Sequence, residues 1–252
     1  MKNFIKYILQ KLLGFQNYLF VFCLFKIKTL RSDKHEKDFL YFLGLISPGG
    51  IVLDIGANIG IMTVYLARKI KDATIFAFEP IPHNIKVLER VISHYKLKNV
   101  TVCKHALGNE DGEIEMVMPV IDLVKMQGLS HVVHKSIPDN NSGERFKIPV
   151  KKIDSISEIM NGPKPVTAIK MDVENFENFV LDGAKELMKK YKPVIYCELW
   201  DNENRYKCFE LVKSMGYEIK MLVKGELVVY ATEVAKAHPT QNFFFIHKTF
   251  QS

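Results

Sequence analysis

A turn rich in small residues has the residue types needed to bind a ligand. It reads DIGANIG, from Asp54 to Gly60, and stands between an apolar run and a helix-like segment. Gly56 and Gly60 allow the backbone to turn tightly and to approach a ligand, and the helix start that follows offers free N–H groups. Asp54 is expected to place a carboxylate at the mouth of this turn. A carboxylate there favours a cationic group and repels a diphosphate.

A second acidic residue, Glu79, ends the apolar run TIFAFE, about twenty residues beyond the turn. A carboxylate at this place can accept two hydrogen bonds from a ribose diol, a group that nicotinamide dinucleotides and methionine-derived nucleosides share. Dinucleotide sites favour the pattern G-x-G-x-x-G, whereas Ala57 and Asn58 stand here where a second glycine is expected. The two features together favour a nucleoside with a cationic amino-acid group over a dinucleotide.

Further carboxylates follow two later apolar runs. Asp172, Glu174 and Glu177 come after PVTAIKM, and Glu198 ends PVIYCE. Because the carboxyl ends of parallel strands form the ligand crevice of an open α/β sheet, these side chains are expected to meet. A sugar hydroxyl needs a base to become a good nucleophile. Asp172 is the first candidate for this base or for positioning the acceptor, Glu174 is the second, and Lys170 can orient a carboxylate or reach solvent.

Two alternatives concern the same chemistry. The four carboxylates offer the oxygen ligands that magnesium or calcium prefers, although Glu177 can instead stabilise a helix start, and we predict no metal site. His131 and His134, in a polar stretch, are alternative bases, but histidines in loops are more often surface residues. Of the two histidines, His134 is kept as a third candidate catalytic residue, after Asp172 and Glu174.

The elements that must position these residues alternate between apolar runs and helix-like segments from about Gly50 onward. This alternation predicts an α/β fold with a mostly parallel, seven-stranded sheet and helices on both faces. The predicted strands are 51–55, 74–79, 99–107, 165–174, 193–199, 217–223 and 242–248, with 226–230 left open, and the predicted helices are 59–70, 84–95, 176–190 and 203–216. Residues 108–162 interrupt the pattern with a hairpin and a long polar stretch, 127–146, and are expected to cover the acceptor.

Composition limits the class of protein. A chain of 252 residues with 48% hydrophobic residues can bury one substantial core. The four cysteines form no C-x-x-C pair, which indicates free thiols in a reducing compartment. Residues 1–40 contain eight lysine or arginine residues and three acidic ones, so they carry five of the seven net positive charges. The nearly neutral remainder disfavours nucleic acid as a partner.

Residues 1–40 are predicted to form a basic, amphipathic, helical extension. Their longest uncharged span, 12–25, is shorter than the roughly 20 residues that a membrane helix needs, and the lysines and the lack of a small-x-small site fit a signal peptide poorly. One interpretation is that these helices pack on the catalytic domain. The other is a surface that rests on an anionic membrane near a lipid-linked substrate.

Four blocks in this order resemble the FkbM family of methyltransferases: DIGANIG, AFEP, NVTVCKHALGNEDGEIEM and IKMDVENFENFVLDGA. The resemblance covers roughly Gly50 to Leu199. It implies a class I methyltransferase fold of the Rossmann-like type over residues 41–252, with S-adenosylmethionine as methyl donor. It also implies O-methylation, often of a sugar or another secreted metabolite.

The resemblance assigns roles to residues of this chain. Asp54, Gly56, Asn58 and Gly60 correspond to the loop around the methionine part of the donor, Glu79 to the ribose acceptor, and His105 and Ala106 to the adenine contact. For His105, an ordinary histidine at a strand end is an equal alternative. The family block D-V-E-G-x-E has Asn175 in place of its glycine here. Asparagine tolerates a left-handed backbone well, so the turn is expected to survive.

The predicted function is therefore S-adenosylmethionine-dependent O-methylation of a hydroxyl on a sugar, glycan, glycolipid or related metabolite. The alternatives are a nucleic-acid methyltransferase, although no N-P-P-Y-type motif is present, a nucleotide-binding or membrane-tethering protein without catalysis, and a dinucleotide oxidoreductase. The expected location is the cytoplasm, with peripheral contact at the inner face of the membrane as an option.

Overall fold

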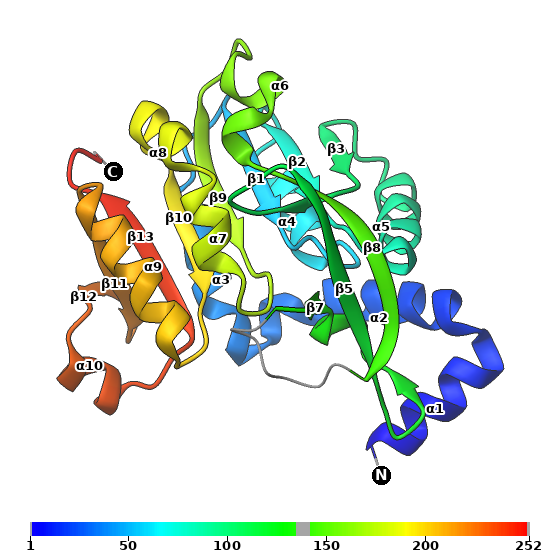
Figure 1. Cartoon of the computed structure of the whole chain (residues 1–252). Coiled ribbons are helices and arrows are strands. Elements are labelled where there is room, and N and C mark those ends of the chain that lie inside the picture. Colours follow the sequence, from blue (N-terminus) through cyan, green and yellow to red (C-terminus); the bar gives the residue numbers. More distant parts are fainter. Residues whose placement is uncertain (1, 135–141, 251–252) are drawn as a thin grey trace.

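The centre of the molecule is a twisted sheet whose middle strands run parallel (Figure 1). A computed structural model describes residues 2–134 and 142–250. The sheet order is β12 (Glu226–Val229), β11 (Tyr217–Val223), β13 (Asn242–His247), β10 (Val194–Glu198), β9 (Val166–Met171), β1 (Ile51–Ile55), β2 (Thr74–Phe78) and β3 (Val100–Cys103). The strands from β10 to β3 are parallel to one another, while β13, β11 and β12 pair antiparallel. Each of the seven predicted strands has a counterpart in this sheet, the one over 99–107 only in part, and β12 adds an eighth at the edge.

The apolar runs form strands because both faces of this sheet are buried. Every residue of β1 is buried, and Phe243, Phe244 and Phe245 of β13 are almost completely so. A strand that is covered on both faces gains by burying every side chain, so its sequence is continuously apolar instead of alternating. The polar side chains that interrupt such runs, Asp54 and Lys170, therefore need partners inside the protein.

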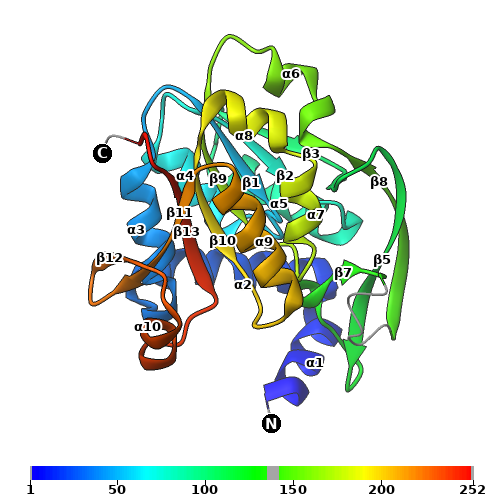
Figure 2. The ribbon, with the colours of Figure 1, turned by 60° about the vertical axis from the view of Figure 1, so that its left-hand side comes forward.

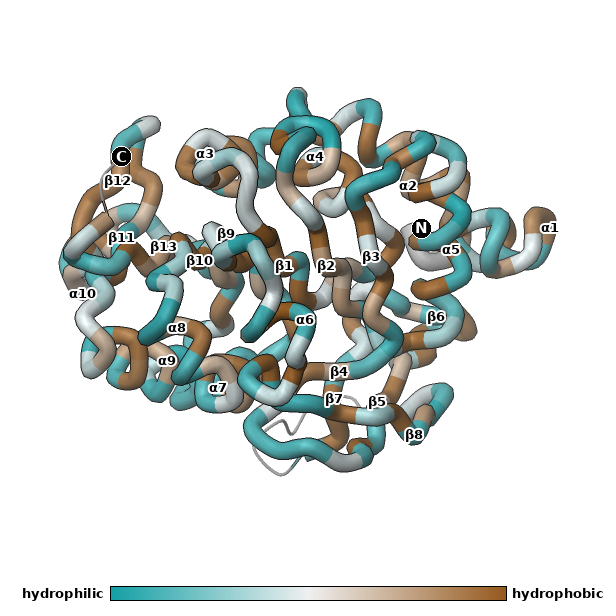
Figure 3. Tube along the Cα trace, turned by 90° about the horizontal axis from the view of Figure 1, so that it is seen from above, coloured by the Kyte–Doolittle hydropathy of each residue, from teal (hydrophilic) through white to brown (hydrophobic). Residues whose placement is uncertain are grey.

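Helices cover both faces of the sheet (Figure 3). One face packs against α3 (Lys37–Leu45), α4 (Ile61–Lys69) and α5 (Pro82–His94). The other face packs against α7 (Glu177–Asp182), α8 (Lys185–Tyr191) and α9 (Glu203–Ser214). The α/β class with helices on both faces, which the alternation of elements predicts, is confirmed. Two shorter helices, α6 (Ser157–Met160) and α10 (Thr232–Ala237), lie in connections.

The predicted single helix over 176–190 is wrong in one respect, because it is two helices. The break falls at Gly183, where an added Cβ would collide with the carbonyl oxygen of Gly108. The second helix, α8, begins against the carboxylate of Asp154, which accepts hydrogen bonds from the backbone N–H groups of Glu186 and Leu187 at 2.9 Å each. The segment is therefore divided for two reasons: the backbone of Gly108 approaches Gly183 closely, and Asp154 caps the N-terminus of α8.

A second sheet lies over the carboxyl ends of the central strands. It contains β4 (Ala106–Leu107), β8 (Gly143–Lys151), β5 (Gly112–Ile121) and β6 (Val124–Lys125), with β7 (His131–Val132) paired to β5. The prediction of one continuous strand over 99–107 is wrong, because the chain leaves the main sheet after Cys103 and pairs with β8. Likewise, the polar stretch 127–146 contributes β7 and part of β8. Its residues 135–141 lie outside the described part of the chain.

The N-terminal segment forms α1 (Lys2–Leu13) and α2 (Phe15–Thr29). Gly14, with φ of 72°, separates them, and their axes are bent by 115°. Leu19 and Cys23 of α2 are fully buried against α4 and α5, whereas α1 points away from the body of the protein (Figure 2). Among the described residues no single helix is both long and apolar enough to cross a membrane; only the bent pair meets that test of length and composition together. The division of the chain at residue 40 stays a prediction.

Candidate active site

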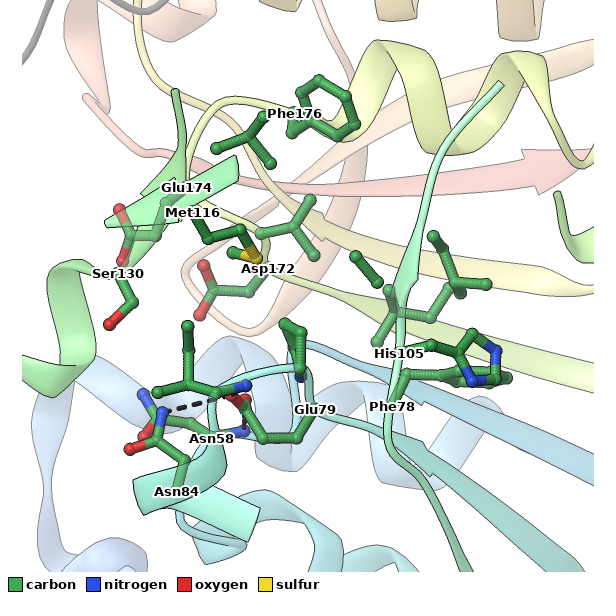
Figure 4. A pocket seen from close by; sticks show the side chains of 18 of the residues that line it. Asn58, Phe78, Glu79, Asn84, His105, Met116, Ser130, Asp172, Glu174 and Phe176 are labelled. Carbon is green, nitrogen blue, oxygen red and sulfur yellow. Dashed lines mark hydrogen bonds between the residues drawn. The ribbon is translucent and has the colours of Figure 1, made fainter. Parts of the chain in front are cut away.

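A pocket opens at the carboxyl ends of β1, β2 and β9, and the second sheet forms its opposite wall (Figure 4). It offers about 610 Å³ of space that protein atoms do not fill, part of which is open to solvent. Seven of the predicted site residues line it: Gly56, Asn58, Glu79, His105, Ala106, Asp172 and Glu174. Segments far apart in the sequence are brought together here, as expected for the crevice of an open α/β sheet. Asp54, Gly60 and His134 do not line it.

The glycine turn owes its shape to contacts on both sides. Gly56 has φ of 75°, and the backbone carbonyl of Asp172 occupies the place where a Cβ would lie, so any other residue would be strained and would clash. Gly60 has φ of 93°, begins α4 and packs against Leu88. Asn58, with φ of 52°, directs its backbone N–H to Glu79. The two glycines therefore hold the turn between β9 and α5, and only Gly56 borders the pocket.

Glu79 is held by three donors from the protein. One carboxylate oxygen, Oε2, accepts from the backbone N–H of Asn58 at 2.8 Å. The other, Oε1, accepts from the backbone N–H of Ile81 at 2.9 Å and from Nδ2 of Asn84 at 3.2 Å. Since a carboxylate has about four acceptor positions, roughly one remains, on Oε2. Burial raises the pKa of Glu79 to about 7, although these three hydrogen bonds oppose the rise.

Asp54 lies beneath the turn, which corrects the expectation that its carboxylate stands at the mouth. Its side chain is fully buried, Thr63 Oγ1 donates to Oδ2 at 2.6 Å, and Lys170 Nζ lies 3.6 Å from Oδ1. Lys170 also donates to the carbonyl of Gly56 at 2.9 Å and lies 4.0 Å from Asp172. Of the two alternatives for Lys170, the orienting one is confirmed, because the side chain is only 3% exposed. This buried ion pair ties β1, the turn and β9 together.

Several carboxyl groups gather at the ends of β9 and β10. Burial, with Asp172 and Glu198 nearby, raises the pKa of Glu174 to about 9. Burial also raises the pKa of Glu177 and of Glu198 to about 7 each. Asp172 is about one-third exposed and faces the pocket. Glu174 is consequently a neutral hydrogen-bond donor at neutral pH. Among the described residues, no group of three or more His, Cys, Asp or Glu side chains could hold a metal ion.

Asparagine is tolerated at position 175, where the FkbM pattern has glycine, because its side chain has hydrogen-bond partners. Asn175 has φ of 73°, and Glu174 before it has φ of 55°, so both are left-handed as the glycine pattern implies. The Asn175 Oδ1 accepts from Nδ2 of Asn202 at 2.9 Å and from Nδ2 of Asn204 at 3.1 Å. Glu177 begins α7 and accepts from the backbone N–H of Val173 at 3.0 Å. The substitution therefore keeps the turn and connects it to α9.

His105 lies at the far end of the pocket from Asp172 and Glu174 (Figure 4), and the next residue, Ala106, also lines the pocket. The imidazole of His105 packs edge-on against Phe78, with ring centroids 5.4 Å apart, and burial lowers its pKa. Its Nε2 atom is buried and has no hydrogen-bond partner among the described residues. A neutral imidazole with an unused nitrogen is suited to an uncharged aromatic ring that carries donors or acceptors.

The two candidate histidines of the insert lie elsewhere. His134 is exposed and packs on the rings of Phe179 and Phe176, with centroids 5.0 and 6.2 Å away, and Phe176 stands at the pocket wall. His131 is buried in β7 and contacts the carbonyl of Leu129 through Nδ1 at 2.9 Å. Neither histidine lines the pocket. A catalytic role for His134 stays an untested prediction and is less favoured by this geometry than one for Asp172.

Several lining residues were not predicted from the sequence. Asn84, on the first turn of α5, bonds Glu79, and its position five residues after that carboxylate offers a weak signal. Gln127, Ser130 and Met116 come from the insert, which was expected to cover the acceptor without any residue being singled out. Their selection depends on how β5 and β7 fold back over the pocket, a long-range effect that local patterns do not contain.

Comparisons with known proteins agree with this fold. The chain carries an S-adenosylmethionine-dependent methyltransferase domain of the Rossmann-like class. The family model described as "Methyltransferase FkbM domain" matches residues 54–223, and the chain therefore belongs to the FkbM methyltransferase family. The resemblance seen in the four sequence blocks is confirmed, and S-adenosylmethionine is the methyl donor of this class.

Individual relatives are distant. "Methyltransferase 1" of Beauveria bassiana (strain ARSEF 2860) is 26% identical over 181 residues, which are 67% of this chain and 72% of the relative. "Methyltransferase sdnD" of Sordaria araneosa is 24% identical over 209 residues, 72% of this chain and 79% of the relative. The crystal structure of Methyltransferase FkbM from Methylobacillus flagellatus KT has a similar fold, with a TM-score of 0.53 and 19% identity. That match covers 80% of this chain but only 45% of the solved chain.

Proposed function

We propose that this protein transfers a methyl group from S-adenosylmethionine to a hydroxyl of a sugar, a glycan or a related metabolite. The observation that carries the proposal is the juxtaposition in one pocket of Glu79 and His105, which suit a nucleoside, with Asp172, which suits a proton acceptor. The nucleoside groups lie on the β1, β2 and β4 side, and the carboxyl groups follow β9. A nucleoside bound by the first set of groups can therefore extend to the carboxyl groups that follow β9.

The residues present fit the donor. Besides His105 Nε2, the Oδ1 atoms of Asn58 and Asn84 are buried and lack hydrogen-bond partners within the described ranges, and both residues line the pocket. Buried polar atoms are normally satisfied, so three such atoms around one pocket point to a polar ligand. Glu79 would hold the ribose through its remaining acceptor position, His105 and Ala106 would contact the adenine, and Gly56 and Asn58 would adjoin the methionine part. Asp54 would act from below by fixing the turn through Lys170.

Donor affinity should depend on the protonation of Glu79. Below a pH of about 7 the carboxyl group of Glu79 is largely protonated in the free protein. A protonated carboxyl group accepts a hydrogen bond from a ribose hydroxyl more weakly than a carboxylate does. Because the pKa is raised, the charged form appears only as pH increases, so the affinity should rise about ten-fold from one pH unit below that value and then level off. Calorimetric titration with S-adenosylmethionine across this range measures the effect. Glu79→Gln should flatten the profile, and an equal slope in both proteins would contradict the assignment.

Proton removal falls to Asp172 in this arrangement. S-adenosylmethionine supplies, when bound, an activated methyl group whose transfer to oxygen leaves S-adenosylhomocysteine and frees one proton. Asp172 accepts that proton from the acceptor hydroxyl, and Lys170 Nζ lies 4.0 Å from Asp172 Oδ2. Glu174, neutral because its pKa is about 9, donates a hydrogen bond to the acceptor. The second sheet excludes water and orients the acceptor through polar groups of the insert, among them Gln127 and Ser130.

The acceptor class rests on the polar character of the pocket near Asp172. Gln127, Ser130, Asp172 and Glu174 can form hydrogen bonds there, and Met116 and Val132 offer apolar surface. Alternating polar groups and apolar surface suit a sugar ring, which has hydroxyls at its edge and C–H groups on its faces. We further infer that the protein acts in the cytoplasm and does not use nucleic acid as its substrate; its four cysteines are free thiols, and its positive charge is concentrated outside the pocket-bearing part.

Two measurements test the proposed function. Calorimetry should show binding of S-adenosylmethionine and of S-adenosylhomocysteine but not of NAD, and binding of NAD alone would contradict the donor assignment. Mass spectrometry of glycans from cells with and without the protein should reveal species that differ by one methyl group. Methylation found only on RNA or DNA would contradict the acceptor class while leaving the donor assignment intact.

A further inference from the structure

The first helix presents an apolar face that the rest of the described chain leaves uncovered. Exposed apolar side chains recur on one side of α1 at helical spacing: Phe4, Ile5, Ile8, Leu9 and Leu12. Phe4 is 65% exposed and Leu12 is 77% exposed. Gln10 points the other way, exchanging two hydrogen bonds of 3.3 Å with the backbone of Lys125 in β6. The helix is therefore anchored with its apolar face outward, and such a face marks an interaction surface.

Cationic side chains border this face. Lys11 follows Phe4 by seven residues and Ile8 by three, and Lys6 precedes Leu9 by three, so the lysines lie along the two margins of the apolar stripe. A helix with an apolar face between lysines is the pattern of helices that lie in the surface of a bilayer. Long lysine side chains can bury their stems against apolar surface and keep their charges at the headgroups.

The helix α1 also lies close to the rim of the pocket. The turn between β5 and β6 holds Leu123, which is 74% exposed, and the contact of Gln10 with Lys125 keeps this turn beside α1 (Figures 1 and 2). Immediately after β6, Gln127 and Ser130 line the pocket. The helix α1 is therefore close, through β6, to the acceptor side of the active site.

A cationic hollow lies further along, where α2 meets α3, α4 and α5. Lys28, Arg31, Arg68 and Lys69 line it, without any aspartate or glutamate. None of these four forms an ion pair within the ranges 2–134 and 142–250. On α2, Val21 and Phe25 are 54% and 61% exposed and share a face with Lys28, at spacings of four and three residues. Apolar surface and unpaired positive charge therefore adjoin each other on this helix.

We propose that α1 and α2 dock the protein on an anionic lipid bilayer, with the α1 face in the interface and the hollow receiving acidic headgroups. The positive charge of this surface favours a bilayer as the partner. Anionic headgroups attract the lysines of α1 and the cationic residues of the hollow, whereas the same surface on a second copy of the chain would repel them. The bend of 115° and the burial of Leu19 and Cys23 keep α2 on the protein, so α1 lies along the membrane. This docking does not depend on the proposed acceptor.

Vesicle sedimentation of the full chain tests the proposal. The protein should pellet with phosphatidylcholine vesicles that contain phosphatidylglycerol and much less with phosphatidylcholine alone. Substituting Ile5→Ser, Leu9→Ser and Leu12→Ser together should weaken partitioning at least about ten-fold, because three exposed apolar anchors are lost. Arg68→Gln with Lys69→Gln should weaken it about five-fold for each charge.

Matched controls separate docking from general charge or hydrophobicity. Val229→Ser removes an equally exposed apolar side chain from β12, and Lys213→Gln with Lys236→Gln removes two exposed charges from α9 and α10; none should change pelleting. Equal pelleting of the wild-type protein and the triple α1 variant would overturn the proposal. The proposal would also be overturned if the wild-type protein did not bind vesicles but formed a dimer, and if sedimentation velocity showed that the triple variant is a monomer. Donor binding, measured in parallel, should be unchanged in every variant.

Discussion

Asp172→Asn should lower kcat about 100- to 10,000-fold, the range expected when a general base is removed. The substitution keeps the shape of the side chain and removes only its ability to take a proton. Asp172 faces the pocket, is about one-third exposed and has Lys170 at 4.0 Å, so the folded structure should survive the change. The Kd for S-adenosylmethionine, measured by calorimetry, should stay nearly constant, because Glu79 and His105 hold the nucleoside.

Two further variants make this result specific. Glu174→Gln should lower kcat by less than about ten-fold, because Glu174, with a pKa of about 9, already carries its proton and glutamine also donates a hydrogen bond. The matched control is Asp182→Asn. Asp182, the last residue of α7, has an exposed carboxylate that pairs with Lys185, and its substitution should not change kcat. If Asp172→Asn left turnover unchanged, or if Glu174→Gln were the more damaging change, Asp172 would not be the base.

Lys170→Met should lower the free energy of unfolding by about 3–5 kcal/mol, the typical cost of breaking a buried ion pair from one side. Lys170 is 3% exposed and Asp54 is fully buried, and Asp54 Oδ1 has no hydrogen-bond partner in the described chain, so the lysine at 3.6 Å is its principal compensation. The carbonyl of Gly56 also loses its donor at 2.9 Å. Urea denaturation followed by tryptophan fluorescence or circular dichroism measures the change.

The double variant Asp54→Asn, Lys170→Met provides the internal check, because it removes the uncompensated charge and should recover part of the lost stability. Lys185→Met breaks an exposed pair with Asp182 and should cost less than about 1 kcal/mol. Equal losses for Lys170→Met and Lys185→Met would show that the buried pair does not stabilise the turn. Full additivity of the Asp54 and Lys170 substitutions would show that the two groups do not interact.

Local patterns were sufficient for much of the fold and for part of the site. The continuous apolar run at 51–55 and the alternation of strands with helices reflect burial that each segment must satisfy, so the α/β class could be predicted. The positions of Gly56, Glu79 and Asp172 could be predicted for a related reason: parallel strands bring their carboxyl ends to one edge, whatever the details of packing. Asn175 could be expected to adopt a left-handed backbone because that preference belongs to the residue itself.

The alternation of strands and helices implies parallel strands, and backbone preference belongs to single residues, so both could be read from the chain and indicated which carboxyl groups meet near the edge of the sheet. What those groups can do depends on packing between distant segments. Asp54 is a buried support because Lys170, distant in sequence, reaches it, and Glu174 holds a proton because it is buried, with Asp172 and Glu198 close by. His134 lies outside the pocket because the insert folds as a second sheet. Burial and pKa depend on neighbours that only folding brings into contact, and so they could not be predicted from the chain alone.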